Sequence, residues 1–394
     1  MALRHLLRGA APVAVAALTL SSSMTAAQAS AAPGWRLVKV YGASAGSPFL
    51  EGLSATRATD AWVSGTAIQL ATQALFIVRW NGTRWTRLAA PRAFTVPAPE
   101  TESDGVIGSS SRADMWTFPD IVKGSTSVQY ALHWNGAAWK SFRLLGTIPF
   151  VGILSTAVFS PTDAWAFGQA PVKHPSGGFG APYAVRFNGR AWRRVPMPGT
   201  AALGLSALSP SNIWAFGPTA RTAGLLNQVM IGMHWNGKAW NTLAVPRYKV
   251  SGKLAVVQSM IALGRHNVWA AESLPANRCG CQPMPLGIIL AHWNGRSWSE
   301  VVRDGSDALQ GDLVADGSGG LWLQSFSARS PMVEELLHYS GGRLSRVREP
   351  SVPGFFTFNF QMALIPGTTS LWAVAGLGPS PAGAPEGAIF KRGT

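Results

Sequence analysis

The stretch Asp163-Ala-Trp-Ala-Phe-Gly168 decides the fold, because its tryptophan recurs along the chain at intervals of 49 to 55 residues. The equivalent tryptophans are Trp62, Trp116, Trp165, Trp214, Trp269, Trp322 and Trp372. The residue two positions before the tryptophan is Asp or Asn in the first five copies. It is Gly320 in the sixth copy and Ser370 in the seventh. A constant period of this length indicates one supersecondary unit that is repeated seven times.

A second signature, His133-Trp-Asn-Gly-Ala-Ala-Trp139, follows the first within the repeat. It returns at 234–240 and 292–298, and in altered form at 79–85, 186–192 and 338–344. Asn-Gly between alternating apolar residues is a strong hairpin signal, because both central residues of a type I′ turn need positive φ. The repeat is therefore predicted to contain a hairpin with a type I′ turn.

Each unit divides into four short strands, which is typical of a β-propeller blade. In the third unit the first two strands are expected at 154–159 and 164–168, and the last two flank the Asn-Gly turn. The seventh unit ends at 388–394 without its fourth strand, and the segment 33–38 matches that strand in the other units. We therefore predict an all-β, seven-bladed propeller over residues 33–394, whose last blade is closed by the N-terminal strand. Closure removes an exposed sheet edge.

Residues 1–29 are predicted to be a signal peptide. Arg4 and Arg8 precede a short apolar run at 10–20, and a small-x-small cleavage pattern follows at 27–29. We therefore expect a secreted, extracellular protein, and a monomer.

Two later stretches, 144–162 and 355–385, contain no charged residue and are long enough to raise the question of membrane spans. Both are interrupted by Gly and Pro and lie in phase with the repeat. We interpret them as buried strands with their turns, so no transmembrane segment is predicted in the mature chain.

The chain carries 33 Lys and Arg against 18 Asp and Glu, a formal net charge of +15. This excess favours anionic partners, and it predicts an anionic glycan, a cell-wall polymer or a protein as the ligand. The basic residues are scattered without a compact Lys/Arg run, so nucleic acid is not specifically indicated. A general contribution to solubility is the alternative explanation of the charge.

All 17 tryptophans fall into three columns of the repeat alignment: seven in the second strand, four in the third and six in the fourth. Tryptophan can serve as a stacking platform for sugars, which would make these residues a binding surface. Because their positions follow the repeat, packing between blades is the better explanation.

Candidate catalytic groups are few. Asp60, Asp114 and Asp163 recur at equivalent turns between the first two strands, where Asp is expected to cap the turn backbone. Four histidines recur at one position of the third strand, where a half-buried imidazole that donates to neighbouring backbone is expected. They are His133, His234, His292 and His338. We assign no catalytic residue, no metal site and no cofactor, and the chain lacks the phosphate-binding, dinucleotide-binding and nucleophile-elbow motifs.

The repeat resembles those of secreted bacterial propellers in the broad sialidase-like, Asp-box-like and WD40/YVTN-like group, over essentially the whole mature chain. An Asp-box reads Ser-x-Asp-x-Gly-x-x-Trp. Gly136 to Trp139 keep its second half, but Trp134 stands where that motif has Asp. The sixth unit, from Asp312 to Trp322, also looks like a repeat of the propeller lyases that act on streptogramins. These resemblances imply the fold and leave the family activities unsupported.

The connections between the repeats divide into two kinds. The turns after the first and third strands are short and alike, whereas the connections after the second and fourth strands vary and lie on the opposite face. Binding sites tend to lie on variable loops of a rigid scaffold, although tolerated insertions are the alternative. The ligand-binding residues predicted on this variable face are Arg92, Asp120, Lys123, Lys173, His174 and Arg221.

Two functions are compatible with this pattern. The first is a secreted, non-catalytic binding or interaction module for a cell-wall, glycan or protein ligand. The alternative is an extracellular, glycosidase-like hydrolase or lyase, which would require a convergent pair of acids beside a basic residue.

Cysteine occurs only at Cys279 and Cys281. In an exported protein these two are candidates for a disulfide. A bridge across one residue would be strained, and free thiols or an intermolecular bond are the alternatives.

Overall fold

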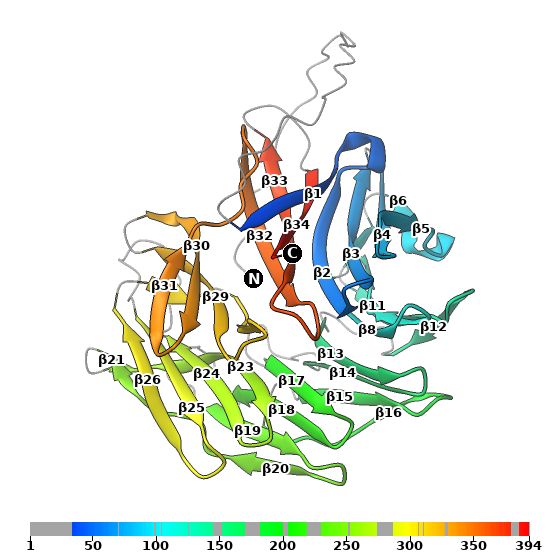
Figure 1. Ribbon diagram of the computed structural model, residues 1–394. Helices are drawn as coiled ribbons and strands as arrows, with labels where there is room; N and C mark the ends of the chain where they lie inside the picture. Colours follow the sequence, from blue (N-terminus) through cyan, green and yellow to red (C-terminus); the bar gives the residue numbers. More distant parts are fainter. Residues whose placement is uncertain are drawn as a thin grey trace.

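The computed structural model shows a ring of antiparallel β-sheets, which are the blades of a propeller (Figure 1). It describes residues 34–69, 71–97, 100–103, 105–124, 126–144, 152–169, 182–199, 204–218, 230–250, 253–273, 287–305, 307–309, 311–327, 330–379 and 386–393. Within these ranges no helix is long and apolar enough to cross a membrane.

Seven blades follow one another around the ring, and each has four principal strands, named in order from the innermost to the outermost. Blade 1 contains β2 (Pro48–Arg57), β3 (Asp60–Gln69), β4 (Thr72–Trp80) and β5 (Trp85–Leu88). Blade 2 contains β8 (Ile107–Ser111), β9 (Asp114–Thr117), β11 (Thr126–Trp134) and β12 (Trp139–Arg143). Blade 3 contains β13 (Gly152–Ser160), β14 (Asp163–Gln169), β15 (Pro182–Phe187) and β16 (Trp192–Arg194).

The remaining blades repeat this order. Blade 4 contains β17 (Gly204–Ser209), β18 (Asn212–Pro218), β19 (Met230–Trp235) and β20 (Trp240–Leu243). Blade 5 contains β23 (Val256–Gly264), β24 (Asn267–Ser273), β25 (Ile288–Trp293) and β26 (Trp298–Asp304). Blade 6 contains β28 (Val314–Ala315), β29 (Leu321–Ser327), β30 (Ser330–Ser340) and β31 (Arg343–Val347). Blade 7 contains β32 (Phe355–Leu364), β33 (Leu371–Pro379), β34 (Glu386–Arg392) and β1 (Trp35–Tyr41).

The N-terminal strand closes the ring, as the sequence predicted. β1 pairs antiparallel with β34, and Trp35 lies opposite Arg392 while Leu37 lies opposite Phe390. The last blade thereby gains its fourth strand from the other end of the chain. The first blade packs against this completed sheet through an apolar cluster that contains Phe76 of blade 1 and Trp372 of blade 7.

The seven tryptophans of the second strands pack between blades, which confirms the structural interpretation. Their exposed fractions lie between 0% and 7%. Ring centroids across neighbouring blades are 5.1 Å apart for Trp85 and Trp372, and 5.0 Å apart for Trp116 and Trp192. Close aromatic contacts of this kind stabilise a core beyond the burial of apolar area. The repeated tryptophans are therefore core residues.

The Asn-Gly hairpins exist, but the predicted type I′ turn is wrong. Trp80 lies opposite Trp85, and the N–H of Asn81 donates to the carbonyl of Arg84. Gly82 is therefore the first of two central residues, and it alone has a positive φ, of 99°. Glycine with positive φ at this place is the mark of a type II′ turn. The side chain of Asn81 instead accepts hydrogen bonds from the N–H groups of Thr83 and Arg84, at 3.0 and 2.9 Å.

Several variable connections are strands, although the sequence predicted only loops there. In the link between blades 1 and 2, β6 (Thr95–Pro97) pairs with β4, and β7 (Thr101–Ser103) pairs with β10 (Asp120–Lys123). A small hairpin of β21 (Lys249–Val250) and β22 (Lys253–Leu254) lies between blades 4 and 5. β27 (Asp307–Leu309) pairs with β29 in blade 6. β6, β7, β10 and β27 extend the sheets of their blades, whereas β21 and β22 form a separate two-stranded sheet. The variable face is thus built of regular strands in these places.

Candidate functional site

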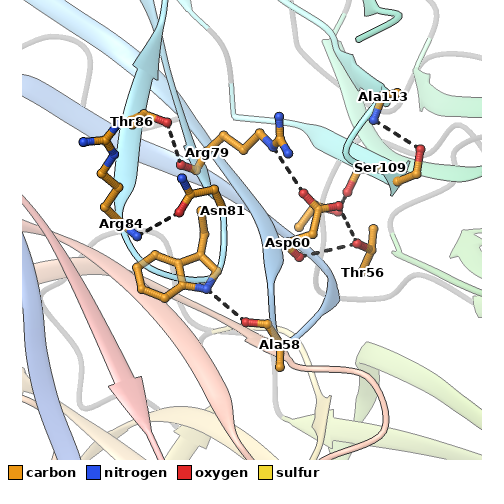
Figure 2. Close-up of polar contacts among 12 residues, drawn as sticks. Thr56, Ala58, Asp60, Arg79, Asn81, Arg84, Thr86, Ser109 and Ala113 are labelled. Carbon is orange, nitrogen blue, oxygen red and sulfur yellow. Dashed lines mark hydrogen bonds and ion pairs between the residues drawn. The ribbon is translucent and has the colours of Figure 1, made fainter.

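The repeated aspartates hold side chains of their own blade. In blade 1, Asp60 is fully buried and accepts hydrogen bonds from the Thr56 hydroxyl at 2.7 Å and from Arg79 Nε at 3.3 Å (Figure 2). The guanidinium of Arg79 lies over the ring of Trp62, 5.2 Å from its centroid. The carboxylate thus orients a cation on the core tryptophan. The predicted cap of the turn backbone is wrong for Asp60, Asp114 and Asp163, because their carboxylates bond to side chains. Asp316 of blade 6 does cap its turn and accepts from the N–H groups of Ser318 and Gly320.

The repeated histidines take the place of Arg79 in other blades. His133 Nε2 lies 2.8 Å from Asp114 Oδ1, and its ring stacks on Trp116 with a centroid distance of 4.2 Å. His338 pairs with Asp316 at 2.9 Å in the same way. Asn212 and Asn267 replace the aspartate in blades 4 and 5, where they contact His234 and His292 at 2.9 Å. The partner is therefore a side chain, and the predicted hydrogen bond to the backbone is wrong. These histidines are used in packing the blades.

Three of the predicted ligand residues are described, and all three lie at the junction of blades 1 and 2. Arg92 begins a short 3₁₀ helix (Arg92–Phe94) and is exposed. Asp120 and Lys123 lie at the two ends of β10. The Lys123 ammonium lies 2.6 Å from Glu100 Oε1, which raises the pKa of the lysine through the hydrogen bond and the opposite charge.

This ion pair gives the junction of blades 1 and 2 mixed charge, so it does not form a purely basic surface. Asp120 also accepts a hydrogen bond from the Ser127 hydroxyl at 3.0 Å. The other predicted positions lie outside the described residues: Lys173, His174, Arg221, Cys279 and Cys281.

A buried carboxylate breaks the repeat in blade 5. Glu272 lies on β24 at the position where Gly168 ends the motif Asp163-Ala-Trp-Ala-Phe-Gly168. It is 0% exposed, and burial raises its pKa to about 7. Its Oε2 accepts a long hydrogen bond of 3.4 Å from the N–H of Tyr248, and its Oε1 has no hydrogen-bond partner among the described residues. Because it is buried, this carboxylate cannot contact a polymeric ligand in this conformation.

A groove of about 670 Å³ opens between blades 6 and 7. It is lined by the end of β31, the linker that follows it, and the start of β32. Outer strands end, and inner strands begin, at the variable face, so the groove opens there. Within the described residues Phe356, with 60% of its surface exposed, is the most exposed of the large hydrophobic side chains. The sequence had predicted a buried strand at this position, and for Phe356 that prediction is wrong.

Phe356 is exposed but fixed in place. Its ring rests on Gly378 of the neighbouring strand β33, where the Cβ of any other residue would overlap the ring. The ring of Phe358 covers Gly376 in the same manner, and its centroid lies 5.6 Å from that of Phe356. The side chain is thus held by its neighbours while its free side faces solvent. A fixed aromatic ring loses little conformational entropy when a ligand stacks on it.

Charged side chains border this ring, and one of them is also fixed. Arg346 donates to Asp307 at 2.6 Å and to Glu335 at 3.2 Å, so its guanidinium is held at the wall of the groove. Arg348 is exposed and takes part in no ion pair among the described residues. The groove therefore offers a fixed aromatic ring next to both a bound and a free guanidinium.

The sequence contains a signal for the exposed Phe356 and one for the buried Glu272, although neither was predicted. The run Phe355-Phe356-Thr357-Phe358-Asn359-Phe360 is more aromatic than any other first strand, and strict alternation would expose some of these rings. Glu272 stands out because the equivalent residue is glycine in the consensus motif. In both places the informative signal is a departure from the repeat.

Comparisons with known proteins establish the fold only. No family model matches the chain, and no curated protein matches it. The propeller domain of the Trilobed protease from Pyrococcus furiosus, described as having an open velcro topology, is 10% identical, covers 87% of this chain and 93% of its own, and has a TM-score of 0.53. YCF48 from Cyanidioschyzon merolae is 11% identical over 91% of this chain and 98% of its own, with a TM-score of 0.48.

Proposed function

We propose that this protein is an exported binding propeller that recognises a glycan or cell-wall polysaccharide through its variable face, without converting it chemically. The groove between blades 6 and 7 is the observation that carries this proposal. The ring of Phe356 is exposed and yet held on Gly378, so a ligand can stack on it at little cost in conformational entropy.

The chemistry of the groove favours a sugar ring as the ligand. One face of a pyranose presents C–H groups, which pack on an aromatic face, while its hydroxyls project from the rim of the ring. Phe356 offers the aromatic face, and Arg348 offers donors for a hydroxyl or carboxylate oxygen. Arg346 is held in position by Asp307 and Glu335, so the wall of the groove is prepared before a ligand arrives.

Replacement of Phe356 tests the proposal. Phe356→Ala should lower the affinity for the bound oligosaccharide by about tenfold, since one aromatic contact is commonly worth ~1 kcal/mol or more. Phe356→Trp should retain binding because it restores the platform. Leu208→Ala is the control, because Leu208 is also an exposed apolar residue but lies in blade 4. Binding is measured by calorimetry on glycans selected from an array of wall polysaccharides. Equal affinity of Phe356→Ala and the wild type would place the ligand elsewhere.

The predicted basic residues of the variable face form a second part of this test. Neutralising Lys123, Lys173 and Arg221 together should reduce retention on acidic glycans more than on neutral ones, because the attraction that is removed acts only on charged groups of the glycan. Equal loss on both glycans, or no loss, would remove these three residues from the site. Export itself is tested by sequencing the N-terminus of protein recovered from culture medium, which should begin after residue 29.

A further inference from the structure

The outer strands of four consecutive blades carry an unbalanced positive charge. These strands are β1 of blade 7, β5 of blade 1, β12 of blade 2 and β16 of blade 3, and none of them contains an acidic residue. Their basic residues are Arg36, Lys39, Arg87, Lys140, Arg143, Arg193 and Arg194, and all seven are exposed. We call this surface the basic rim.

One cation of each of these four outer strands lies over an aromatic ring. Lys39 Nζ lies 5.4 Å from the centroid of Tyr41, and Arg87 lies 4.8 Å from that of Phe76. In the next two blades the pairs are Lys140 with Phe142 at 4.9 Å and Arg194 with Tyr183 at 5.8 Å. A cation over an aromatic face is attracted by the ring quadrupole. The contact lies within the outer strand for Lys39 and Lys140, and joins the outer strand to the third strand for Arg87 and Arg194. Each of the four blades thus presents one cation that is held against its own outer surface.

Five of the seven basic residues of the rim have no acidic partner within the part of the chain that the structure describes. Arg36, Lys39, Lys140, Arg193 and Arg194 take part in no ion pair there. The other blades differ. The outer strand β20 of blade 4 carries no charged residue, and β26 of blade 5 pairs its Arg303 with Glu300 at 2.6 Å. In blade 6 Arg346 is bound by carboxylates, whereas Arg343 of the same strand is exposed and takes part in no ion pair among the described residues. The unbalanced charge is therefore concentrated on the arc of blades 7, 1, 2 and 3, with one further cation in the adjoining blade 6.

We infer that the basic rim binds an extended, flexible anionic polysaccharide or wall polymer with carboxylate or phosphate groups along its length. β1, β5, β12 and β16 are the outermost strands of four neighbouring blades, and β5, β12 and β16 can be followed along the outside of the ring in Figure 1. Their charges therefore lie along a convex curve. A flexible chain can follow this curve and contact all four blades, whereas a flat bilayer can touch only part of it. A small anion would contact only one or two of the charges, and it would not explain why basic residues recur on four neighbouring blades.

This inference shares with the proposed function only the location outside the cell, because the rim and the groove are separate surfaces. Failure of one can therefore be recognised without failure of the other. Phe356→Ala should not change binding at the rim, and rim variants should not change the affinity for a neutral oligosaccharide in the groove.

The test removes five charges from the rim and compares this with the removal of five elsewhere. The rim variant replaces Arg36, Lys39, Lys140, Arg193 and Arg194 with Gln. The control variant replaces five exposed basic residues at the short turns after the first and third strands, on the face opposite the variable face. They are Arg57, Arg112, Lys238, Arg265 and Arg296. Both variants lose the same net charge. Thermal unfolding confirms that each remains folded, and exposed substitutions of this kind usually change stability little.

Binding is measured against polygalacturonate and poly(glycerol phosphate), which present the two anionic groups. The rim variant should bind at least one of them about tenfold or more weakly than the wild type, with a smaller dependence on salt, while the control variant should bind like the wild type. The polymer that shows this loss identifies the anionic group. Equal losses in the two variants would reduce the effect to net charge and overturn the inference. Stronger rim-dependent binding to single-stranded DNA or to phosphatidylglycerol vesicles would overturn the choice of partner.

Discussion

At the scale of single residues, the repeat uses its polar groups to fix its tryptophans. Asp163 holds Arg186 by two hydrogen bonds of 2.8 Å, and the guanidinium of Arg186 lies 5.3 Å from the centroid of Trp165. The position of the tryptophans could be predicted because a large apolar residue in register with a repeat belongs to the core. The role of the histidines could not, because the second strand and the third strand meet only in the folded sheet.

Truncation of Trp165 should be strongly destabilising. Trp165 is 0% exposed and contacts Phe167 of its own strand and Trp235 of the next blade. Trp165→Ala should lower the free energy of unfolding by ~3–5 kcal/mol through the cavity that it leaves. Urea unfolding measures this loss, with Val301→Ala as an exposed apolar control. A loss below about 1 kcal/mol for Trp165→Ala would contradict the core assignment.

The buried Glu272 should make stability depend on pH. Burial raises its pKa to about 7, so the folded protein binds a proton more tightly than the unfolded chain does. Stability therefore falls as the pH rises from about 4.5, the ordinary value, to about 7, and the folded state must then hold a buried charge. The groups around this carboxylate are Tyr248, Glu300 and Arg303.

Glu272→Gln should remove this dependence. The variant keeps the shape of the side chain without its charge, so it should be more stable than the wild type at pH 8 by up to ~3 kcal/mol and similar to it at pH 4.5. Melting curves of both proteins across this range measure the difference. Parallel curves, with a constant gap or none, would mean that Glu272 does not titrate in the folded protein.

At the scale of elements, the hairpin turns depend on one glycine each. Gly82 has a φ of 99°, and the equivalent Gly136, Gly189, Gly237 and Gly295 have values between 88° and 96°. The Asn-Gly pair was enough to predict the hairpin, because both type I′ and type II′ turns favour glycine. It was not enough to predict the turn type, which depends on whether Asn81 is a central residue or the residue before the turn.

Gly82→Ala should therefore destabilise blade 1 by ~1 kcal/mol, because alanine pays a steric cost at positive φ. Gly105→Ala is the matched control: Gly105 does not have a positive φ, and an added methyl group would meet only ordinary contacts there. That control should be neutral or slightly stabilising. Equal effects of the two substitutions in chemical denaturation would show that the conformation of Gly82 is not the cause.

The strands of the variable face could not be predicted from the sequence, because the repeat does not include them. β7 pairs with β10, although the two strands come from different connections. β7 precedes the first strand of blade 2, and β10 follows the second strand of that blade. Pairing of this kind depends on the geometry of the finished blades. For the same reason the groove at Phe356 could not be predicted, because it is formed by two blades together.

At the scale of the whole molecule, closure joins the two ends of the chain in one sheet. The missing fourth strand of the last unit could be predicted from the sequence alone, because the segment at Trp35 has the pattern of a fourth strand. β1 supplies it and pairs with β34 from Trp35 to Tyr41. The free edge of β34 is thereby covered, and the apolar cluster between blades 7 and 1 is completed.

Deletion of residues 34–41 should open this junction. The shortened protein should melt at a lower temperature than the chain that lacks only residues 1–29, and it should self-associate, because the edge of β34 becomes available for pairing. Light scattering during thermal unfolding follows both effects. An unchanged melting temperature without aggregation would show that the ring does not depend on its N-terminal strand.

Hydrogen–deuterium exchange of the bound protein tests whether the ring is divided into a structural face and a binding face. At saturation with the wall oligosaccharide that binds best, exchange should slow at 346–351 and 355–357, which line the groove. The hairpin turns of the opposite face, such as 81–84 and 135–138, should exchange as they do in the free protein. Protection of those turns, or binding without protection at the groove, would contradict this division of the ring.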